Sequence, residues 1–214
     1  MVEITEKDVV SFEKDGVIKI KGFIPVNQLE ELGRAITPYL PRRKLLNKLI
    51  FGDSLFFSKP NVWKSDPYFL QFVQQPMFID LAIKLLRSNR INLLQDVIFV
   101  KSANSRQKFA WHHDLIYAPI HGKMVVSFWM ATENVTLHHG GIQFIKGSHR
   151  WTENFGPPPN LAPISKVFPQ YWRKYLPGKS SNLSPRAVED SDKYSKDAVV
   201  SFDLEQGDLL AFHG

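Results

Sequence analysis

The sequence predicts a mainly β fold of the sandwich or jelly-roll kind, with helices packed outside it. Two observations support this. Helical patterns dominate the first part of the 214 residues, and short β segments separated by turns follow from Asn92 onward. Helices followed by many short strands are typical of a layered or closed β core with helices against it. We therefore expect a single domain over residues 1–214, with a helical N-terminal part at 1–91 and a β core at 92–214.

Capping and helix-breaking residues mark the ends of the first helix and the start of the second. Thr5 can cap a helix that runs to about Lys14, and Gly16 ends it. Residues 17–23 then alternate apolar and polar side chains, which predicts a strand with one solvent-exposed face. Pro25 opens the second helix.

The third helix has the clearest pattern of the chain. After Pro76, apolar residues recur at helical spacing, which predicts a stripe laid on a core. They are Phe78, Leu81, Ala82, Leu85 and Leu86. Between the second and third helices, residues 41–66 are basic and read as irregular.

The β core is expected to contain several short strands and one long loop. The expected strands are 93–101, 109–117, 123–132, 142–145, 198–204 and 209–212. Residues 151–197 hold half of the 14 prolines and predict a long loop that acts as a lid, forms a binding loop or is disordered.

The amino-acid composition excludes several classes of protein and of site. The 43% hydrophobic content indicates a folded chain, and the absence of cysteine excludes a disulfide scaffold, thiolate catalysis and cysteine-ligated metal. No apolar run approaches the roughly 20 residues of a membrane span, and the N-terminus is charged where a signal peptide would be apolar. We therefore expect a cytoplasmic protein with no membrane partner. The sequence does not indicate an oligomeric state.

A positive net charge can indicate nucleic-acid binding. The net charge is +6, but no zinc-finger spacing, basic zipper region or aromatic RNA-binding signature accompanies it. No nucleic-acid partner is expected. A solvated basic face explains the charge most simply, and attraction of an anionic small-molecule substrate is the alternative.

A candidate metal site lies in the expected strand from Phe109 to Tyr117. In a strand, His112 and Asp114 would point to the same side with Cα atoms about 6.6 Å apart. An imidazole and a carboxylate so placed can be two ligands of a facial triad on iron(II), which leaves positions open for oxygen and a co-substrate. A bare His-x-Asp recurs by chance, so the hypothesis needs further landmarks.

Such landmarks occur in order along the chain. They are Phe12-x-x-Asp15-Gly16 with Lys21-Gly22-Phe23, Gln95 to Lys101, Trp111-His112-x-Asp114 followed by Tyr117, Trp129-x-x-x-Glu133, Gly140-Gly141 to Gly147-Ser148-His149, and Gly207-Asp208-x-x-x-Phe212-His213. Together they resemble the phytanoyl-CoA dioxygenase family of iron(II)/2-oxoglutarate-dependent oxygenases over essentially the whole chain.

The resemblance implies a double-stranded β-helix (jelly roll) that binds Fe(II) and the co-substrate 2-oxoglutarate. The co-substrate is decarboxylated to succinate while a small organic substrate is hydroxylated. His112 and Asp114 match the first two iron ligands of the family, and no catalytic residue beyond the ligands is implied. Related halogenases lose the carboxylate, so Asp114 favours hydroxylation.

The resemblance also implies site residues around the metal. The co-substrate positions are Val97, Phe109, Trp129, His113 and Lys59, and the substrate positions are Gln95 and Tyr117. Each has a simpler alternative: core packing for the aromatic residues, His113 and Val97, solvation for Lys59, and a backbone partner for Gln95.

The C-terminal end departs from the family pattern. A third ligand would stand near position 218 and a 2-oxoglutarate-binding Arg near position 229, whereas the chain reaches Gly214. We therefore expect a C-terminally truncated oxygenase whose iron binding is impaired. Two alternatives stay open. The first is a non-catalytic jelly-roll module that binds a ligand, and the second is a cupin-like metal site completed by His213.

Overall fold

The computed structural model describes residues 2–40, 56–101, 111–117, 122–151 and 198–214. In these ranges it has four α-helices and seven strands, joined by turns and short 3₁₀ helices. The helices are α1 (Glu6–Asp15), α2 (Val26–Ile36), α4 (Pro67–Val73) and α5 (Pro76–Leu86). The strands are β1 (Val17–Ile20), β2 (Phe56–Pro60), β3 (Val97–Lys101), β4 (Val126–Met130), β5 (Gln143–Ile145), β6 (Val199–Ser201) and β7 (Leu209–His213).

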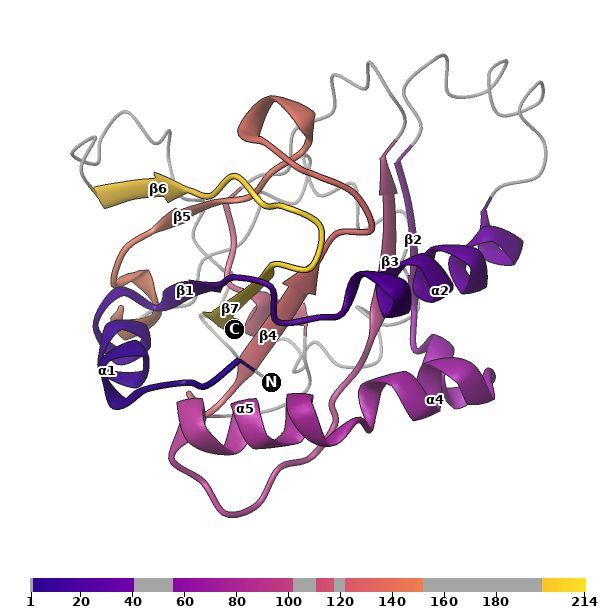
Figure 1. Cartoon of the computed structure of the whole chain (residues 1–214). Helices are drawn as coiled ribbons and strands as arrows, with labels where there is room; N and C mark the ends of the chain where they lie inside the picture. The colour runs from indigo at the N-terminus through magenta and orange to yellow at the C-terminus, as the bar shows by residue number, and fades with distance from the viewer. Residues whose placement is uncertain (1, 41–55, 102–110, 118–121, 152–197) are drawn as a thin grey trace, which may run out of the picture.

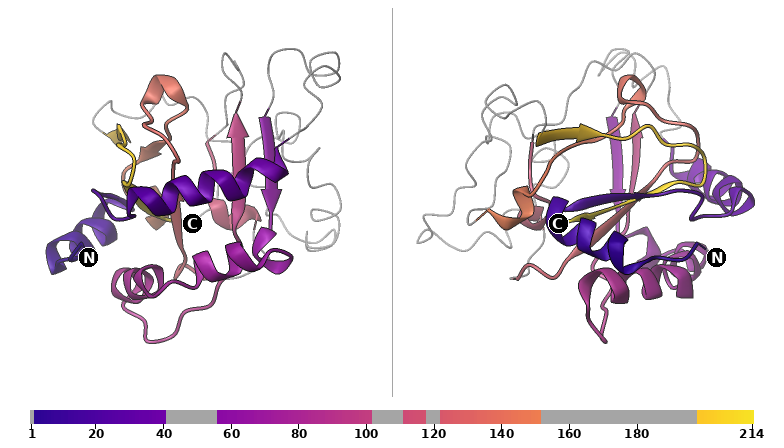
Figure 2. Two further views of the ribbon diagram at one scale, coloured as in Figure 1. Left: turned by 45° about the vertical axis from the view of Figure 1, so that its right-hand side comes forward. Right: turned by 60° about the vertical axis from the view of Figure 1, so that its left-hand side comes forward.

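The described strands form antiparallel sheets. One sheet has the order β1-β7-β4, and β2–β3 and β5–β6 form two-stranded sheets. Two strands from the first 91 residues, β1 and β2, thus pair with strands from the later part of the chain. Helices α4 and α5 lie along one side of the strands (Figures 1 and 2).

Local chemistry explains the helix ends. Thr5 and Asp8 form a capping box at the start of α1, as the Thr5 cap predicted. Gly16 ends α1 with φ 82°, in the left-handed region that glycine adopts without strain. Pro76 occupies the first turn of α5, whose predicted apolar stripe is buried at Phe78, Leu81, Ala82 and Leu85, while Leu86 is partly buried.

The helix-facing side of the main sheet forms the hydrophobic core. Phe12 of α1, Leu29 of α2 and Leu81 of α5 are fully or almost fully buried there. From β4, Phe128 packs against Phe78 of α5, with ring centroids 6.1 Å apart. Among the described residues, no helix is long and apolar enough to cross a membrane.

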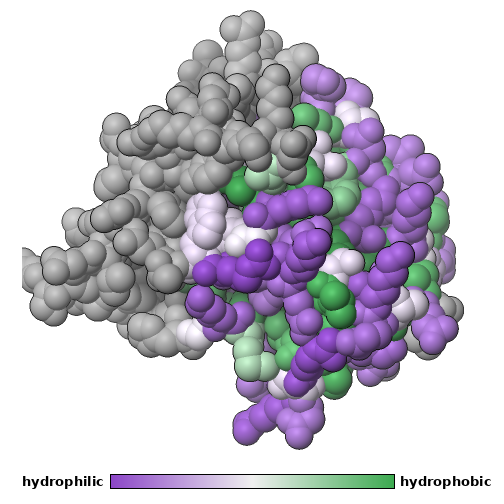
Figure 3. All heavy atoms as spheres, turned by 90° about the vertical axis from the view of Figure 1, so that its left-hand side faces the viewer, coloured by the Kyte–Doolittle hydropathy of each residue, from purple (hydrophilic) through white to green (hydrophobic). Residues whose placement is uncertain are grey.

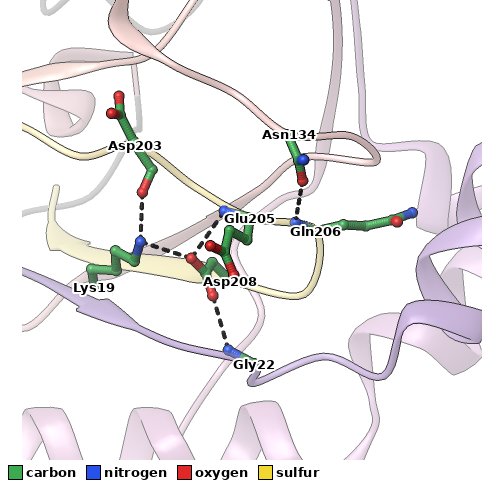
Figure 4. Close-up of polar contacts among 7 residues, drawn as sticks. All are labelled: Lys19, Gly22, Asn134, Asp203, Glu205, Gln206 and Asp208. Atoms are coloured by element: carbon green, nitrogen blue, oxygen red, sulfur yellow. Dashed lines mark hydrogen bonds and ion pairs between the residues drawn. The ribbon is translucent and has the colours of Figure 1, made fainter.

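The turn before β7 is fixed by the buried carboxylate of Asp208 (Figure 4). It accepts hydrogen bonds from the backbone N–H groups of Gly22 and Glu205 and pairs with Lys19 Nζ at 2.8 Å. Burial alone raises the pKa of Asp208, but the Lys19 contact and the two backbone donors together lower it below its ordinary value. Through Asp208, the Gly207-Asp208 landmark therefore connects the turn before β7 to β1 and the residues that follow it.

Two sequence expectations are corrected. Residues 56–60, inside the segment read as irregular, form β2, because β3 supplies a partner strand that the local sequence does not reveal. The expected strand 93–101 is shorter: β3 begins at Val97, and residues 93–96 are neither helix nor strand. The long loop expected at 151–197 lies, apart from Trp151, outside the described residues.

Candidate metal centre

The segment that carries His112 and Asp114 is not a strand. Residues 111–113 lie outside helices and strands, and Asp114 begins the 3₁₀ helix η3 (Asp114–Tyr117). The prediction of a strand is therefore wrong for residues 111–117, and residues 109 and 110 lie outside the described part. Asp is favoured at the start of a turn, because its carboxylate competes with regular backbone pairing.

The structure nevertheless brings the two side chains together. His112 Nε2 lies 3.4 Å from Asp114 Oδ1, and the side chains are 24% and 36% exposed. A small ion can therefore reach the pair from solvent. The two residues meet across a turn instead of along one face of a strand.

Ser127 of β4 orients the carboxylate. Its hydroxyl donates to Asp114 Oδ2 at 2.8 Å, which leaves Oδ1 on the His112 side. Ser127 is not among the site residues predicted from the sequence, because a Ser inside a strand carries no signal until its contact is known. Hydrogen bonds of this kind commonly orient the carboxylate ligands of metals.

Electrostatics keep Asp114 ionised. Burial raises the pKa of its carboxyl group, but the hydrogen bond and charge of His112 and the Ser127 hydrogen bond outweigh it, so the pKa lies below its ordinary value. The carboxylate is thus present at neutral pH in the form that binds metals.

Strand alternation places the site on the side of the main sheet away from the helices. Val126, Phe128 and Met130 pack against the helix-facing core, so Ser127 and Trp129 project to the opposite side. Trp129 therefore shares a sheet face with the residue that holds Asp114. Its role beside the co-substrate stays a prediction.

The same alternation excludes His213 as a partner of the pair. Leu209 and Ala211 belong to the helix-facing core, and His213 shares their face. Its ring stacks on Phe12, with centroids 4.3 Å apart. Among the described residues no group of three or more His, Asp or Glu side chains is arranged to hold a metal, so the cupin-like alternative is wrong for this structure.

The other predicted site residues are spread over several places. Val97 pairs with Pro60, and Lys59 pairs with Ile98. Val97 and Lys59 therefore lie on opposite faces of the β2–β3 sheet, and Lys59 is exposed. His113 lies between the candidate ligands and contacts Ser148.

The substrate roles of Gln95 and Tyr117 stay predictions. Gln95 is exposed ahead of β3, so its amide needs no partner inside the protein. Tyr117 is the last residue of η3. Phe109 lies outside the described residues.

Comparison with solved structures shows which fold this is. The epimerase SnoN, crystallised with Fe³⁺, α-ketoglutarate and nogalamycin RO, matches with a TM-score of 0.61 at 16% identity, over 97% of this chain and 73% of its own. The carbocyclase SnoK from nogalamycin biosynthesis matches with a TM-score of 0.65 at 15% identity, over 98% and 74%. EvdO2 from Micromonospora carbonacea var. aurantiaca matches with a TM-score of 0.66 at 15% identity, over 99% and 82%.

The chain thus shares the fold of non-haem, α-ketoglutarate-dependent enzymes. The profile of the phytanoyl-CoA dioxygenase (PhyH) family matches residues 12–214, and the chain belongs to this family. The family consists of oxygenases and related enzymes that use Fe(II) and 2-oxoglutarate. No curated protein sequence matches the chain.

Proposed function

We propose that this chain forms the core of an Fe(II)/2-oxoglutarate-dependent dioxygenase that hydroxylates a small organic substrate. The observation that carries the proposal is the facing pair of His112 Nε2 and Asp114 Oδ1, 3.4 Å apart. An imidazole and an ionised carboxylate fit two positions of a facial triad. When bound, the iron and co-substrate supply the oxidising chemistry, and the protein supplies ligands and orientation.

The architecture supports a jelly roll. The described sheets are antiparallel, and the solved structures that share the fold belong to enzymes of this chemistry. We propose that the strands form an open β core with its mouth at the His112–Asp114 pair, and that Trp129 borders the co-substrate. The helical part at 1–91 and the β core at 92–214 then act as one domain.

The substrate is proposed to be a small molecule. SnoN was crystallised with nogalamycin RO, which is a small organic ligand. The net charge of +6 favours an anionic group on the substrate of this chain.

Residues 1–214 by themselves are proposed to bind iron weakly. The described residues provide two donors, and the family pattern places the third ligand beyond Gly214. Weak binding that still depends on both donors is therefore expected.

An anaerobic titration with Fe(II) and 2-oxoglutarate tests the proposal. A weak charge-transfer absorption should appear for the wild-type chain and vanish in His112→Ala and Asp114→Ala. His138→Ala is the matched control, because His138 is exposed on a separate turn. A full charge-transfer band would contradict the impairment, and a band that survives both substitutions would contradict the site.

A second candidate function is a binding module without iron chemistry. The observation that favours it is the lack of a third donor among the described residues. In that case neither Fe(II) nor 2-oxoglutarate would change the spectrum of the wild-type chain.

A further inference from the structure

His113, the residue between the two candidate ligands, has contacts of its own. Its Nε2 lies 3.2 Å from the carbonyl oxygen of Ser148, and its ring meets the ring of Trp151 edge to face. Because a carbonyl oxygen can only accept a hydrogen bond, the ring donates its Nε2–H to it. The contact joins the ligand segment to a part of the chain more than thirty residues later.

We call residues 147–151 the anchor turn, because they are fastened to the end of α1. Figure 1 shows this turn, in orange, beside the C-terminus of α1. The attachments are hydrogen bonds from the anchor turn to consecutive backbone carbonyl groups that the helix leaves unpaired. They run from Gly147 N–H to Asp15 at 2.8 Å, from His149 Nε2 to Glu13 at 3.1 Å and from the Arg150 guanidinium to Lys14.

A stack of rings holds the same turn from the side. His149 lies on His213 with ring centroids 4.5 Å apart and planes 8° apart, and His213 lies in turn on Phe12. Phe12 is completely buried in the core. The Ser148 carbonyl group that accepts the hydrogen bond from His113 therefore belongs to a segment that is attached both to the end of α1 and to the hydrophobic core.

The candidate ligands need such a support. Residues 111–113 belong to no helix or strand, so a regular backbone ladder does not fix them. Ser127 holds Asp114 from one side. The His113–Ser148 contact holds the preceding residue from a second direction.

We propose that His113 is a positioning residue that fastens the ligand segment 111–114 to the anchor turn and so keeps His112 and Asp114 facing each other. Its role is structural support of the site and not contact with the co-substrate. The effect on metal binding rests on the proposed function. The effect on the segment itself does not depend on that function.

Two substitutions separate the hydrogen bond from ring packing. His113→Phe keeps a flat ring beside Trp151 but removes the donor, and His113→Gln restores an N–H donor. Hydrogen exchange of the metal-free chain is measured over residues 111–117. Exchange should be faster in His113→Phe and close to wild type in both His113→Gln and the exposed control His138→Gln.

The second arm measures Co(II) affinity in the same variants. Loss of an outer hydrogen bond typically weakens metal binding by about tenfold or more, and His113→Phe should show this loss while His113→Gln recovers it. Unchanged exchange in His113→Phe, or no recovery by His113→Gln, overturns the proposal. Accelerated exchange with unchanged Co(II) affinity overturns the link to the ligands. If the wild-type chain binds no metal, the proposed function fails, and the exchange arm still decides the role of His113.

Discussion

The Asp114 carboxylate divides its two oxygens between His112 and Ser127. This division makes a half-buried acid useful as a ligand, because one oxygen is held while the other faces the neighbouring imidazole. The His-x-Asp pattern could be recognised from sequence, since the two residues are only two positions apart in the chain and belong to a family landmark. Ser127 could not, because its relation to Asp114 exists only once β4 is folded beside η3.

Removing the Ser127 hydroxyl should weaken both metal binding and the fold. In Ser127→Ala the carboxylate can rotate, and we expect about a tenfold loss of Co(II) affinity with a stability cost of about 1–2 kcal/mol. Calorimetric titration and urea denaturation measure the two effects. Ser127→Thr keeps a hydroxyl and is the control; equal affinities in all three proteins would contradict the orienting role.

A buried ion pair supports the turn before β7, and it makes the fold sensitive to acid. The pKa of Asp208 is lower in the folded protein than its ordinary value. Its contribution to stability is therefore complete above the unfolded pKa of about 3.9 and is lost as the pH falls through the folded value. Lys19 supplies the charge that maintains this difference.

Asp208→Asn should cost about 3 kcal/mol at pH 7, because it leaves Lys19 with a buried partner that has no charge. The difference from wild type should shrink as the pH is lowered below about 4. Urea denaturation between pH 3 and pH 7 measures it. Asp203→Asn is the control, because Lys19 contacts only the backbone carbonyl of that exposed residue. A cost for Asp208→Asn that does not vary with pH would contradict this explanation.

At the scale of elements, the join between α1 and the anchor turn depends on the absence of a side chain at Gly16. A Cβ there would overlap His149 Nδ1. Gly16 also has a positive φ of 82°, which by itself disfavours other residues. Two separate costs therefore act at one position.

Gly16→Ala should destabilise the protein by about 2–3 kcal/mol, of which about 1 kcal/mol is the backbone term. Gly22→Ala isolates that term, because Gly22 also has a positive φ but no heavy atom within 4 Å of the added Cβ. We expect it to cost about 1 kcal/mol. Equal urea midpoints for the two variants would show that His149 does not press on Gly16.

Elements bounded by local signals were predicted correctly from sequence. The cap at Thr5, the stop at Gly16 and the apolar stripe after Pro76 all act within a few residues of the helix they define. The segment at 111–117 was not predicted correctly. Its alternation of aromatic and polar residues is typical of a strand, whereas the tertiary contacts of Asp114 favour a turn. The pairing of β1 with β7 joins the two ends of the chain, which no local pattern encodes.

At the scale of the whole molecule, the β1-β7-β4 sheet separates two environments. One face holds the apolar core and the helices, and the other carries Ser127 and Trp129 toward the candidate metal centre. The outer surface on the α1 side is mainly hydrophilic, with hydrophobic areas interrupted by polar side chains (Figure 3). The described surface on that side therefore resembles a solvated face.

The most direct test of the proposed iron site is anomalous X-ray scattering at the iron edge, from crystals of the chain soaked anaerobically with Fe(II) and 2-oxoglutarate. We expect one iron peak about 2.0–2.2 Å from both His112 Nε2 and a carboxylate oxygen of Asp114, as for other imidazole and carboxylate ligands of divalent metals. An iron peak bound elsewhere, with His112 and Asp114 still paired to each other, would contradict it.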